Sequence, residues 1–220
     1  MSSPTVTRQL LLATHNEHKR REFARLFADG GGGDSWEIEA LPAVVILPPE
    51  DGLTFAENAL GKVRAAARAT GRVSIADDSG IEAAALGGAP GVRSARFAGE
   101  HASDDENLQK LVREAPADSA LEYVCVIAFL DPSRNIEQVF EGRCSGRMAA
   151  QPRGEGGFGY DPVFVPDDNP PAGVSAPGGE LGTGSQTMAE LSDQQKDAIS
   201  HRGRATRALL AWLAASPTGG

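Results

Sequence analysis

The segment that most constrains this chain is an apolar run that ends in two adjacent carboxylates, Ala76-Asp77-Asp78-Ser79-Gly80. Val73-Ser74-Ile75 before it favours a strand, and the glycine-rich stretch that continues to Gly99 favours turns. Ligands of α/β proteins usually bind at the carboxyl ends of the strands. The segment therefore predicts a strand that ends at the two carboxylates and places them at a ligand-binding edge.

The two carboxylates are expected to have different roles. Successive side chains of a strand point to opposite faces, so Asp77 and Asp78 cannot both face one site if the strand continues through them. One should do chemistry or bind a cation, and the other should hydrogen-bond nearby backbone. The residues alone leave open which is which, and a purely structural Asp-Asp-Ser-Gly turn is the simpler alternative.

Length and composition favour one soluble globular domain. The chain has 220 residues, of which 40% are hydrophobic and 23% charged. We expect a single domain over 1–220, with loose tails at 1–8 and 216–220. No apolar run approaches the roughly 20 residues that span a bilayer, and no signal peptide is recognisable, so a cytoplasmic location is expected.

Charge and cysteine content narrow the possible partners. The net charge of −9 argues against a broad nucleic-acid or anionic-membrane surface. Cys125 and Cys144 are interpreted as two buried thiols of a cytosolic protein, with a disulfide or metal pair as the alternative. An anionic ligand would need positive groups gathered locally.

A candidate anion-binding turn lies near the start of the chain. Leu10 to Ala13 predicts a buried strand, Thr14-His15-Asn16 a turn, and 17–28 a helix that Asn16 caps. Backbone N–H groups at such a helix start favour anions. Lys19 lies in the first turn, where the helix dipole disfavours a cation unless an anion is near. An ordinary turn with a solvated lysine is the alternative.

A second helix is expected from Thr54 to Thr70, after one or two short strands in 36–46 and a rigid acidic turn at 47–52. Thr54 and Glu57 form a capping box, and Gly71 ends the helix. Lys62 lies on the apolar stripe of this helix. A lysine there either snorkels to solvent or meets an inward negative group.

The second half of the chain predicts five further features. A capping box at Ser103 opens a helix, and 121–130 with 136–148 form a hairpin. A glycine-rich segment at 153–162 surrounds Phe158, where the missing side chains let a flat ligand approach the ring. The loop at 167–186 is expected to be flexible, and Ser192 should cap one last helix.

Together these residues suit nucleoside triphosphate hydrolysis. Glu50 and Asp78 offer hard oxygen ligands for Mg²⁺, which characteristically binds one or two carboxylates plus substrate phosphates. Lys19, Lys62 and Lys196 offer charge for phosphate oxygens. Phe158 can stack on a base, while His201 and Arg202 can donate hydrogen bonds. The sequence contains neither a Walker-type loop nor matched Cys/His spacing for zinc.

Six ordered motifs resemble the inosine triphosphate pyrophosphatase family, the non-canonical purine NTP pyrophosphatases or XTP/dITP diphosphatases. They lie at Ala13–Lys19, Thr54–Ala59, Ala76–Gly80, Leu86–Gly91, Gly157–Pro162 and Ser200–Ala205. The resemblance implies a mixed α/β fold: a long twisted mixed sheet flanked by helices, with two lobes around a central nucleotide-binding cleft. It also implies a homodimer that uses Mg²⁺ to hydrolyse ITP, dITP and XTP to monophosphate and pyrophosphate. This house-cleaning activity removes deaminated purines from the nucleotide pool.

The resemblance also implies roles for individual residues. Asp78 would be the proton acceptor and, with Glu50, a metal ligand. The substrate-binding set would comprise Thr14, His15, Asn16, Lys19, Lys62, Ser79, Phe158, Gly159, Tyr160, Asp161, Lys196, His201 and Arg202. Within that set, the residues up to Lys62 would hold phosphates, Phe158 would stack on the base, and His201 and Arg202 would favour a 6-oxo over a 6-amino purine.

Two departures from the family pattern stand out. His15 occupies a position where the family usually has a small residue, and Gly184-Ser185-Gln186-Thr187 lacks the usual lysine. Three alternatives remain: a Maf-like pyrophosphatase for other modified nucleotides, a catalytically inactive nucleotide sensor, and an RNA-binding α/β protein. The Gly-Phe-Gly-Tyr-Asp and Ser-His-Arg segments argue against the first, the intact acidic and basic groups against the second, and the negative charge against the third.

Overall fold

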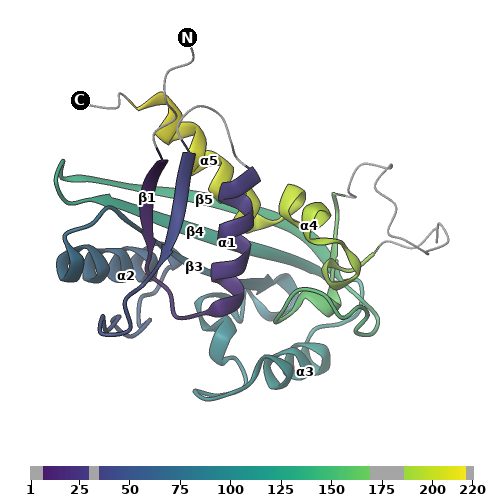
Figure 1. The fold of residues 1–220 in the computed structure, drawn as a ribbon. Coiled ribbons are helices and arrows are strands. Elements are labelled where there is room, and N and C mark those ends of the chain that lie inside the picture. Colours follow the sequence, from purple (N-terminus) through teal and green to yellow (C-terminus); the bar gives the residue numbers. More distant parts are fainter. Residues whose placement is uncertain (1–6, 30–34, 169–185, 217–220) are drawn as a thin grey trace, which may run out of the picture. The chain divides into compact units, whose positions relative to one another are not determined.

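Six strands form one mixed sheet in the order β2-β1-β3-β4-β5-β6 (Figure 1). The structure, a computed structural model, describes residues 7–29, 35–168 and 186–216. The strands are β1 (Thr7–Leu12), β2 (Ser35–Ala40), β3 (Ser74–Ala83), β4 (Ala120–Asp131), β5 (Ile136–Met148) and β6 (Phe164–Pro166). β1 pairs in parallel with both β2 and β3, whereas β5 and β6 are antiparallel. The predicted mixed α/β fold is confirmed.

The chain divides into two compact units, each with its own core. Unit 1 comprises Met1–Asp78, Cys125–Gly142 and Arg204–Gly220, and unit 2 comprises Ser79–Val124 and Arg143–Gly203. The central cleft that the family resemblance implies stays a prediction, as does the assignment of 1–220 to one domain.

Unit 1 is built from the parallel strands and the helices α1 (Glu17–Asp29) and α2 (Phe55–Thr70), with most of α5 (His201–Ala215). Phe23 and Phe27 of α1 pack into the same apolar cluster as Leu10 of β1 and Leu209 of α5. Asn16 caps α1, because its Oδ1 accepts a hydrogen bond from the Lys19 N–H at 3.1 Å. The predicted start of α1 is therefore confirmed.

The predicted limits of α2 are confirmed as well. Thr54 and Glu57 form both hydrogen bonds of the capping box, and the helix ends at Gly71, whose φ of 68° is left-handed. Glycine adopts that conformation without the steric cost that a Cβ imposes. Local chemistry therefore fixes both ends of this helix.

Unit 2 has a separate core around α3 (Asp104–Glu114), α4 (Asp193–Ile199), the start of β4 and the ends of β3 and β5. Leu111 of α3, Tyr123 of β4 and Phe164 of β6 belong to one buried cluster. The predicted capping box at Ser103 and the predicted β4–β5 hairpin are both confirmed. Cys144 lies in this core, while Cys125 is buried in that of unit 1, so both cysteines are buried as expected.

Three expected boundaries were wrong. Strand β3 does not end at Asp78 but continues to Ala83, because Ile81 and Ala83 are fully buried in the core of unit 2. β1 begins at Thr7, inside the segment expected to be a loose tail, because its backbone pairs in parallel with β2 from Ser35 onwards. In both cases tertiary pairing extends a strand that local sequence signals would have ended.

The third wrong boundary concerns the last helix, which is two helices separated at Ser200. This residue has an extended backbone with φ of −64° and ψ of 154°. Its N–H closes α4 on the Lys196 carbonyl, and its Oγ accepts from the Gly203 N–H at 3.0 Å. Ser200 thus acts as the N-cap of α5. Of the loop expected at 167–186, only 167, 168 and 186 lie within the described residues.

Among the helices of the described ranges, none combines the length and the apolar character needed to cross a membrane.

Candidate active site

A buried carboxylate and a partly exposed one, both in unit 1, share one lysine. Lys62 of α2 forms an ion pair with Glu50 Oε1, and its Nζ lies 3.8 Å from Asp78 Oδ1. Glu50 comes from the segment before α2, and Asp78 comes from β3. Only 5% of the Lys62 surface is exposed. The prediction that this lysine meets an inward negative group is confirmed, and the snorkelling alternative is wrong.

The neighbouring carboxylate has a different cation. Asp77 is fully buried, and its Oδ2 lies 3.0 Å from Lys19 Nζ in the first turn of α1. Lys19 therefore meets a negative group of this chain at the helix start, and the expected bound anion stays a prediction. Adjacent strand positions pair with different lysines, while the expected hydrogen bond from backbone to one of the two carboxylates also stays a prediction.

Burial and charge act in opposite directions on the protonation of this cluster. Burial raises the pKa of Asp78, and the nearby ammonium groups of Lys62 and Lys19 offset that effect only in part, so the net pKa is raised. Burial also acts to raise the pKa of Glu50, but Lys62 outweighs it and the net pKa is lowered. The pKa of Lys62 is raised because the three carboxylates outweigh the effect of burial.

The donor chemistry of the cluster fits a hard divalent cation. Glu50 and Asp78 offer only carboxylate oxygens, and the cluster contains one more carboxylate than ammonium. Within the described ranges, no group of three or more His, Cys, Asp and Glu side chains could hold a metal ion. Two carboxylates completed by substrate phosphates is the arrangement that Mg²⁺ favours, whereas zinc favours nitrogen and sulfur ligands.

The turn before α1 is ordered by its own side chains. Thr14 Oγ1 accepts a hydrogen bond from the Asn16 N–H at 3.1 Å, and Asn16 in turn caps the helix. His15 is exposed between them. The turn is therefore locally rigid, and its predicted contacts with phosphate stay a prediction.

A second cluster, in unit 2, is organised by Asp161. This carboxylate is 3% exposed and accepts three hydrogen bonds. The donors are Lys196 Nζ at 2.7 Å, the Phe158 N–H at 2.9 Å and the Tyr123 hydroxyl at 3.1 Å. Asp161 therefore positions the glycine-rich segment and the lysine of α4 in one arrangement.

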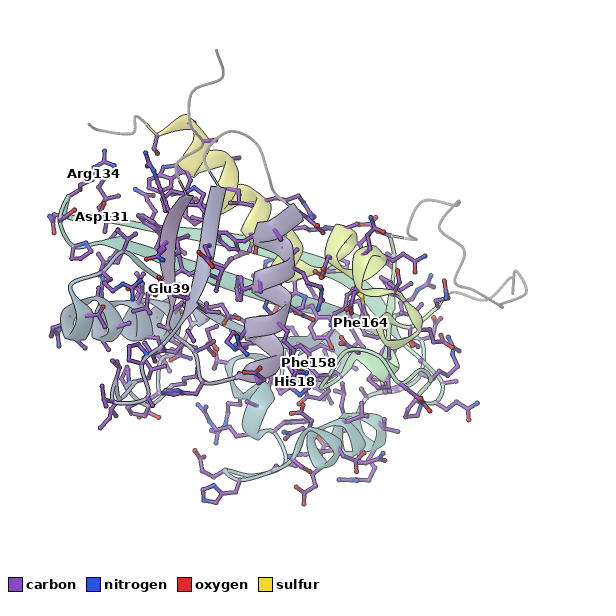
Figure 2. All side chains as sticks on the ribbon, in the orientation of Figure 1. His18, Glu39, Asp131, Arg134, Phe158 and Phe164 are labelled. Carbon is purple, nitrogen blue, oxygen red and sulfur yellow. The ribbon has the colours of Figure 1, made fainter. Side chains whose placement is uncertain are left out.

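Two cations lie near the ring of Phe158, which Figure 2 labels. Lys196 Nζ is 5.0 Å and Arg202 Cζ is 5.8 Å from the ring centroid. Arg202 also donates through Nη2 to Ser79 Oγ at 2.8 Å. Four residues of the predicted base-binding set, Phe158, Asp161, Lys196 and Arg202, are thus brought together within unit 2.

His201 is held by an aromatic stack. Its ring lies 4.6 Å from that of Tyr123 with an interplanar angle of 7°. Tyr123 also contacts the ring of Phe164, which is labelled in Figure 2, at 4.5 Å. The imidazole therefore has a fixed orientation beside the buried core of unit 2.

The hydroxyl of Tyr160 is bonded to the backbone of unit 2. Its hydroxyl donates to the Ser94 carbonyl at 2.7 Å, and 6% of its surface is exposed. Burial raises its pKa further above the usual value. We therefore interpret its side chain as support for the glycine-rich segment, and a substrate contact through its backbone stays a prediction.

A pair of glycine substitutions tests how closely this segment is fitted around Asp161. A Cβ on Gly157 would lie 2.0 Å from Asp161 Oδ2, whereas a Cβ on Gly159 would meet nothing within 4 Å. Both residues have positive φ, so each change to alanine carries a backbone cost of about 1–2 kcal/mol. Gly157→Ala should cost a further roughly 1–3 kcal/mol through the clash. Urea unfolding of the two variants checks this, and equal losses would contradict it.

Two residues of these clusters were missed as site residues in the sequence. Asn58 donates through Nδ2 to Asp78 Oδ2 at 2.9 Å, and Tyr123 supports both Asp161 and His201. Asn58 lies one helical turn before Lys62, and that spacing was a usable signal. No local pattern distinguishes Tyr123 from the other apolar residues of β4.

Known sequences that are similar to this chain belong to one family. Residues 10–212 match the model of the Ham1 family. A dITP/XTP pyrophosphatase of Mycolicibacterium paratuberculosis is 43% identical over 207 residues, which cover 91% of this chain and 93% of the relative. A dITP/XTP pyrophosphatase of Photorhabdus laumondii is 42% identical over 212 residues, covering 92% and 96%. These matches favour neither a Maf-like enzyme nor an inactive sensor.

Solved structures give the same result. A HAM1 protein from Coxiella burnetii superimposes with a TM-score of 0.77 at 35% identity, covering 95% of this chain and all of the other. A protein from Mycobacterium abscessus described as a nucleoside-triphosphatase and dITP/XTP pyrophosphatase has a TM-score of 0.64 at 37% identity, covering 92% and 98%. The family matches nearly the whole length, and the fold agrees. This chain belongs to the Ham1 family.

Proposed function

We propose that this chain hydrolyses the deaminated purine nucleotides dITP, XTP and ITP to the monophosphate and pyrophosphate with Mg²⁺, and so removes them from the nucleotide pool. The names of its relatives support the class of enzyme, a nucleoside triphosphate pyrophosphatase. The observation that carries the proposal is the arrangement of Glu50 and Asp78 around the buried Lys62. The two carboxylates supply oxygen ligands and the lysine supplies positive charge, as cleavage of a triphosphate requires.

The reaction needs a water molecule to be deprotonated as it attacks. The water oxygen bonds to one of the two phosphorus atoms of the α–β bridge, and the bond from that atom to the bridging oxygen breaks, which gives the monophosphate and pyrophosphate. Asp78 accepts the proton, the role that the family resemblance implies for it. Lys62 and Lys19 offset the charge that develops on the leaving group. Bound Mg²⁺, held by Glu50 and Asp78, would polarise the phosphoryl oxygens.

Recognition of the base is assigned to the cluster of unit 2. Phe158 would stack on the purine, with Lys196 placed by Asp161 at its edge. His201 and Arg202 would donate hydrogen bonds to a 6-oxo group. Adenine has a 6-amino group there, which is itself a donor and cannot accept these bonds. Thr14 to Asn16, with backbone groups of Gly159 and Tyr160, would complete the contacts to substrate. We also propose that residues 1–220 form one domain, that the protein is a homodimer and that it acts in the cytoplasm. Light scattering coupled to size-exclusion chromatography would test the dimer.

A substrate panel tests the proposed specificity. Pyrophosphate release is measured from dITP, XTP, ITP, GTP and ATP at equal concentration with saturating Mg²⁺. The three deaminated purines should be hydrolysed with kcat/KM at least about 100-fold above that for ATP, because a site built of hydrogen-bond donors rejects a mismatched partner strongly. Equal turnover of all five would contradict the roles of His201 and Arg202.

Removal of the metal is the matching control. Excess EDTA should abolish pyrophosphate release from XTP, and Mg²⁺ added beyond the chelator should restore it, because without the cation the two carboxylates repel the triphosphate. Full activity in EDTA would exclude the proposed metal-assisted mechanism.

A further inference from the structure

Asn58 connects the two carboxylates of the unit 1 cluster. It lies on the first turns of α2, and 5% of its surface is exposed. Its Nδ2 donates to Asp78 Oδ2 at 2.9 Å, and its Oδ1 accepts from the Gly52 N–H at 2.8 Å. Gly52 follows Glu50 by two residues. One amide side chain therefore contacts one carboxylate directly and the segment that carries the other.

The partners of Asn58 fix the orientation of its amide. The Gly52 N–H can only donate, so the atom facing it must be the oxygen, and the carboxylate of Asp78 requires the nitrogen. The contact uses Asp78 Oδ2, so that Oδ1 is the oxygen on the side of Lys62. Only a short side chain with one donor and one acceptor meets both requirements.

The backbone near Gly52 is fitted closely to the start of α2. A Cβ on Gly52 would lie 2.6 Å from Asn58 Oδ1 and 2.8 Å from Glu57 Cβ, closer than non-bonded atoms approach. The next two N–H groups, of Leu53 and Thr54, donate to Glu57 Oε2 at 2.7 and 3.2 Å. Three successive N–H groups therefore bind the segment to the helix, and the first of them does so through Asn58.

We propose that Asn58, with Gly52, is a positioning device for the metal-binding pair: it orients the carboxylate of Asp78 and sets the place of Glu50 relative to it. This inference rests on the proposed function. Residues that hold metal ligands in place typically change metal affinity or activity by 10- to 100-fold when they are replaced. The device explains why an uncharged amide is buried among carboxylates and lysines.

The first test replaces Asn58 with aspartate, which keeps the acceptor for Gly52 and removes the donor to Asp78. The Mg²⁺ concentration for half-maximal XTP hydrolysis should rise, and kcat should fall, by about 10- to 100-fold. KM for XTP at saturating Mg²⁺ should change less. A second readout needs no turnover: calorimetric binding of an α,β-methylene analogue of XTP should require correspondingly more Mg²⁺.

Asn107 provides a matched control. It is 2% exposed in unit 2, accepts from the Ala98 N–H at 2.7 Å and donates to the Ala95 carbonyl at 3.1 Å. Asn107→Asp thus removes a buried amide that also bonds a loop, in the unit that does not contain the metal-binding pair. It should lower the melting temperature without changing the Mg²⁺ requirement. An equal change in Mg²⁺ requirement in both variants would overturn the inference.

A second pair of variants covers the case in which Asn58→Asp does not fold. Gly52→Ala displaces Asn58 Oδ1 but retains both functional groups, and Gly61→Ala on the same helix brings a Cβ only to 3.7 Å from Pro48 Cγ. Gly52→Ala should raise the Mg²⁺ requirement several-fold, and Gly61→Ala should not. A Gly52→Ala enzyme with the wild-type requirement would overturn the inference. If the wild-type protein did not hydrolyse XTP, that result would overturn the proposed function, whatever the variants show.

Discussion

Replacement of Asp78 by asparagine is expected to reduce kcat for XTP hydrolysis by about 10³-fold or more. The change removes the proton acceptor, whose contribution alone is typically 10²- to 10⁴-fold, and one of the two proposed metal ligands. The fold should survive, because asparagine has the same size and its oxygen can still accept from Asn58 Nδ2. Lys62 also keeps its ion pair with Glu50. Pyrophosphate release with the variant at high enzyme concentration measures the loss.

Asp131→Asn is the matched control for that experiment. Asp131 is also a carboxylate of unit 1 with 7% exposure, but its Oδ1 accepts from the Ser133 N–H at 2.9 Å and the Arg134 N–H at 3.2 Å in the hairpin turn. An asparagine there can still accept both bonds, so kcat should stay near the wild-type value. If kcat of the Asp78→Asn enzyme lay within tenfold of the wild-type value, that result would contradict the role of Asp78 as proton acceptor.

Replacement of Asp161 by asparagine is expected to lower the free energy of unfolding by about 3–5 kcal/mol. The ion pair with Lys196 is almost fully buried, with side-chain exposures of 5% and 4%, and removal of one partner leaves a buried ammonium without its counter-charge. The carboxylate also accepts from the Phe158 N–H and the Tyr123 hydroxyl. Urea unfolding followed by circular dichroism measures the change.

Two further variants show whether the loss comes from the unpaired charge. Asp161→Asn combined with Lys196→Met should recover part of the stability, because no isolated charge then remains buried. Glu137→Gln breaks the exposed pair between Glu137 and Arg64, whose contacts are 2.6 and 2.7 Å, and should cost less than about 1 kcal/mol. If Asp161→Asn lowers the free energy of unfolding no more than Glu137→Gln does, the buried pair of Asp161 and Lys196 does not organise unit 2.

Features that depend on neighbouring residues were predictable from the sequence. The capping boxes at Thr54 and Ser103 and the left-handed Gly71 follow from hydrogen bonds within a few residues. Lys62 was predictable for a related reason, since a lysine on an apolar stripe is costly without an inward anion. The family motifs then indicated which residues bear the chemistry.

Features that depend on distant residues were not predictable. Strand β3 extends to Ala83 because Ile81 is buried in a core. Segments that lie far apart in the sequence form that core. Hydrophobic periodicity predicts one continuous helix through Ser200, because serine is tolerated inside helices as well as at their caps. Asn58 and Tyr123 acquire their roles from Asp78 and Asp161, partners 20 and 38 residues away.

The most direct test of the central claim is the identity of the products formed from XTP. A ³¹P NMR time course with Mg²⁺ and the wild-type enzyme should show the three triphosphate resonances replaced by those of the monophosphate and pyrophosphate in equal amounts. Accumulation of the diphosphate with inorganic phosphate would mean cleavage of the terminal bridge. That result would contradict the proposed pyrophosphatase reaction.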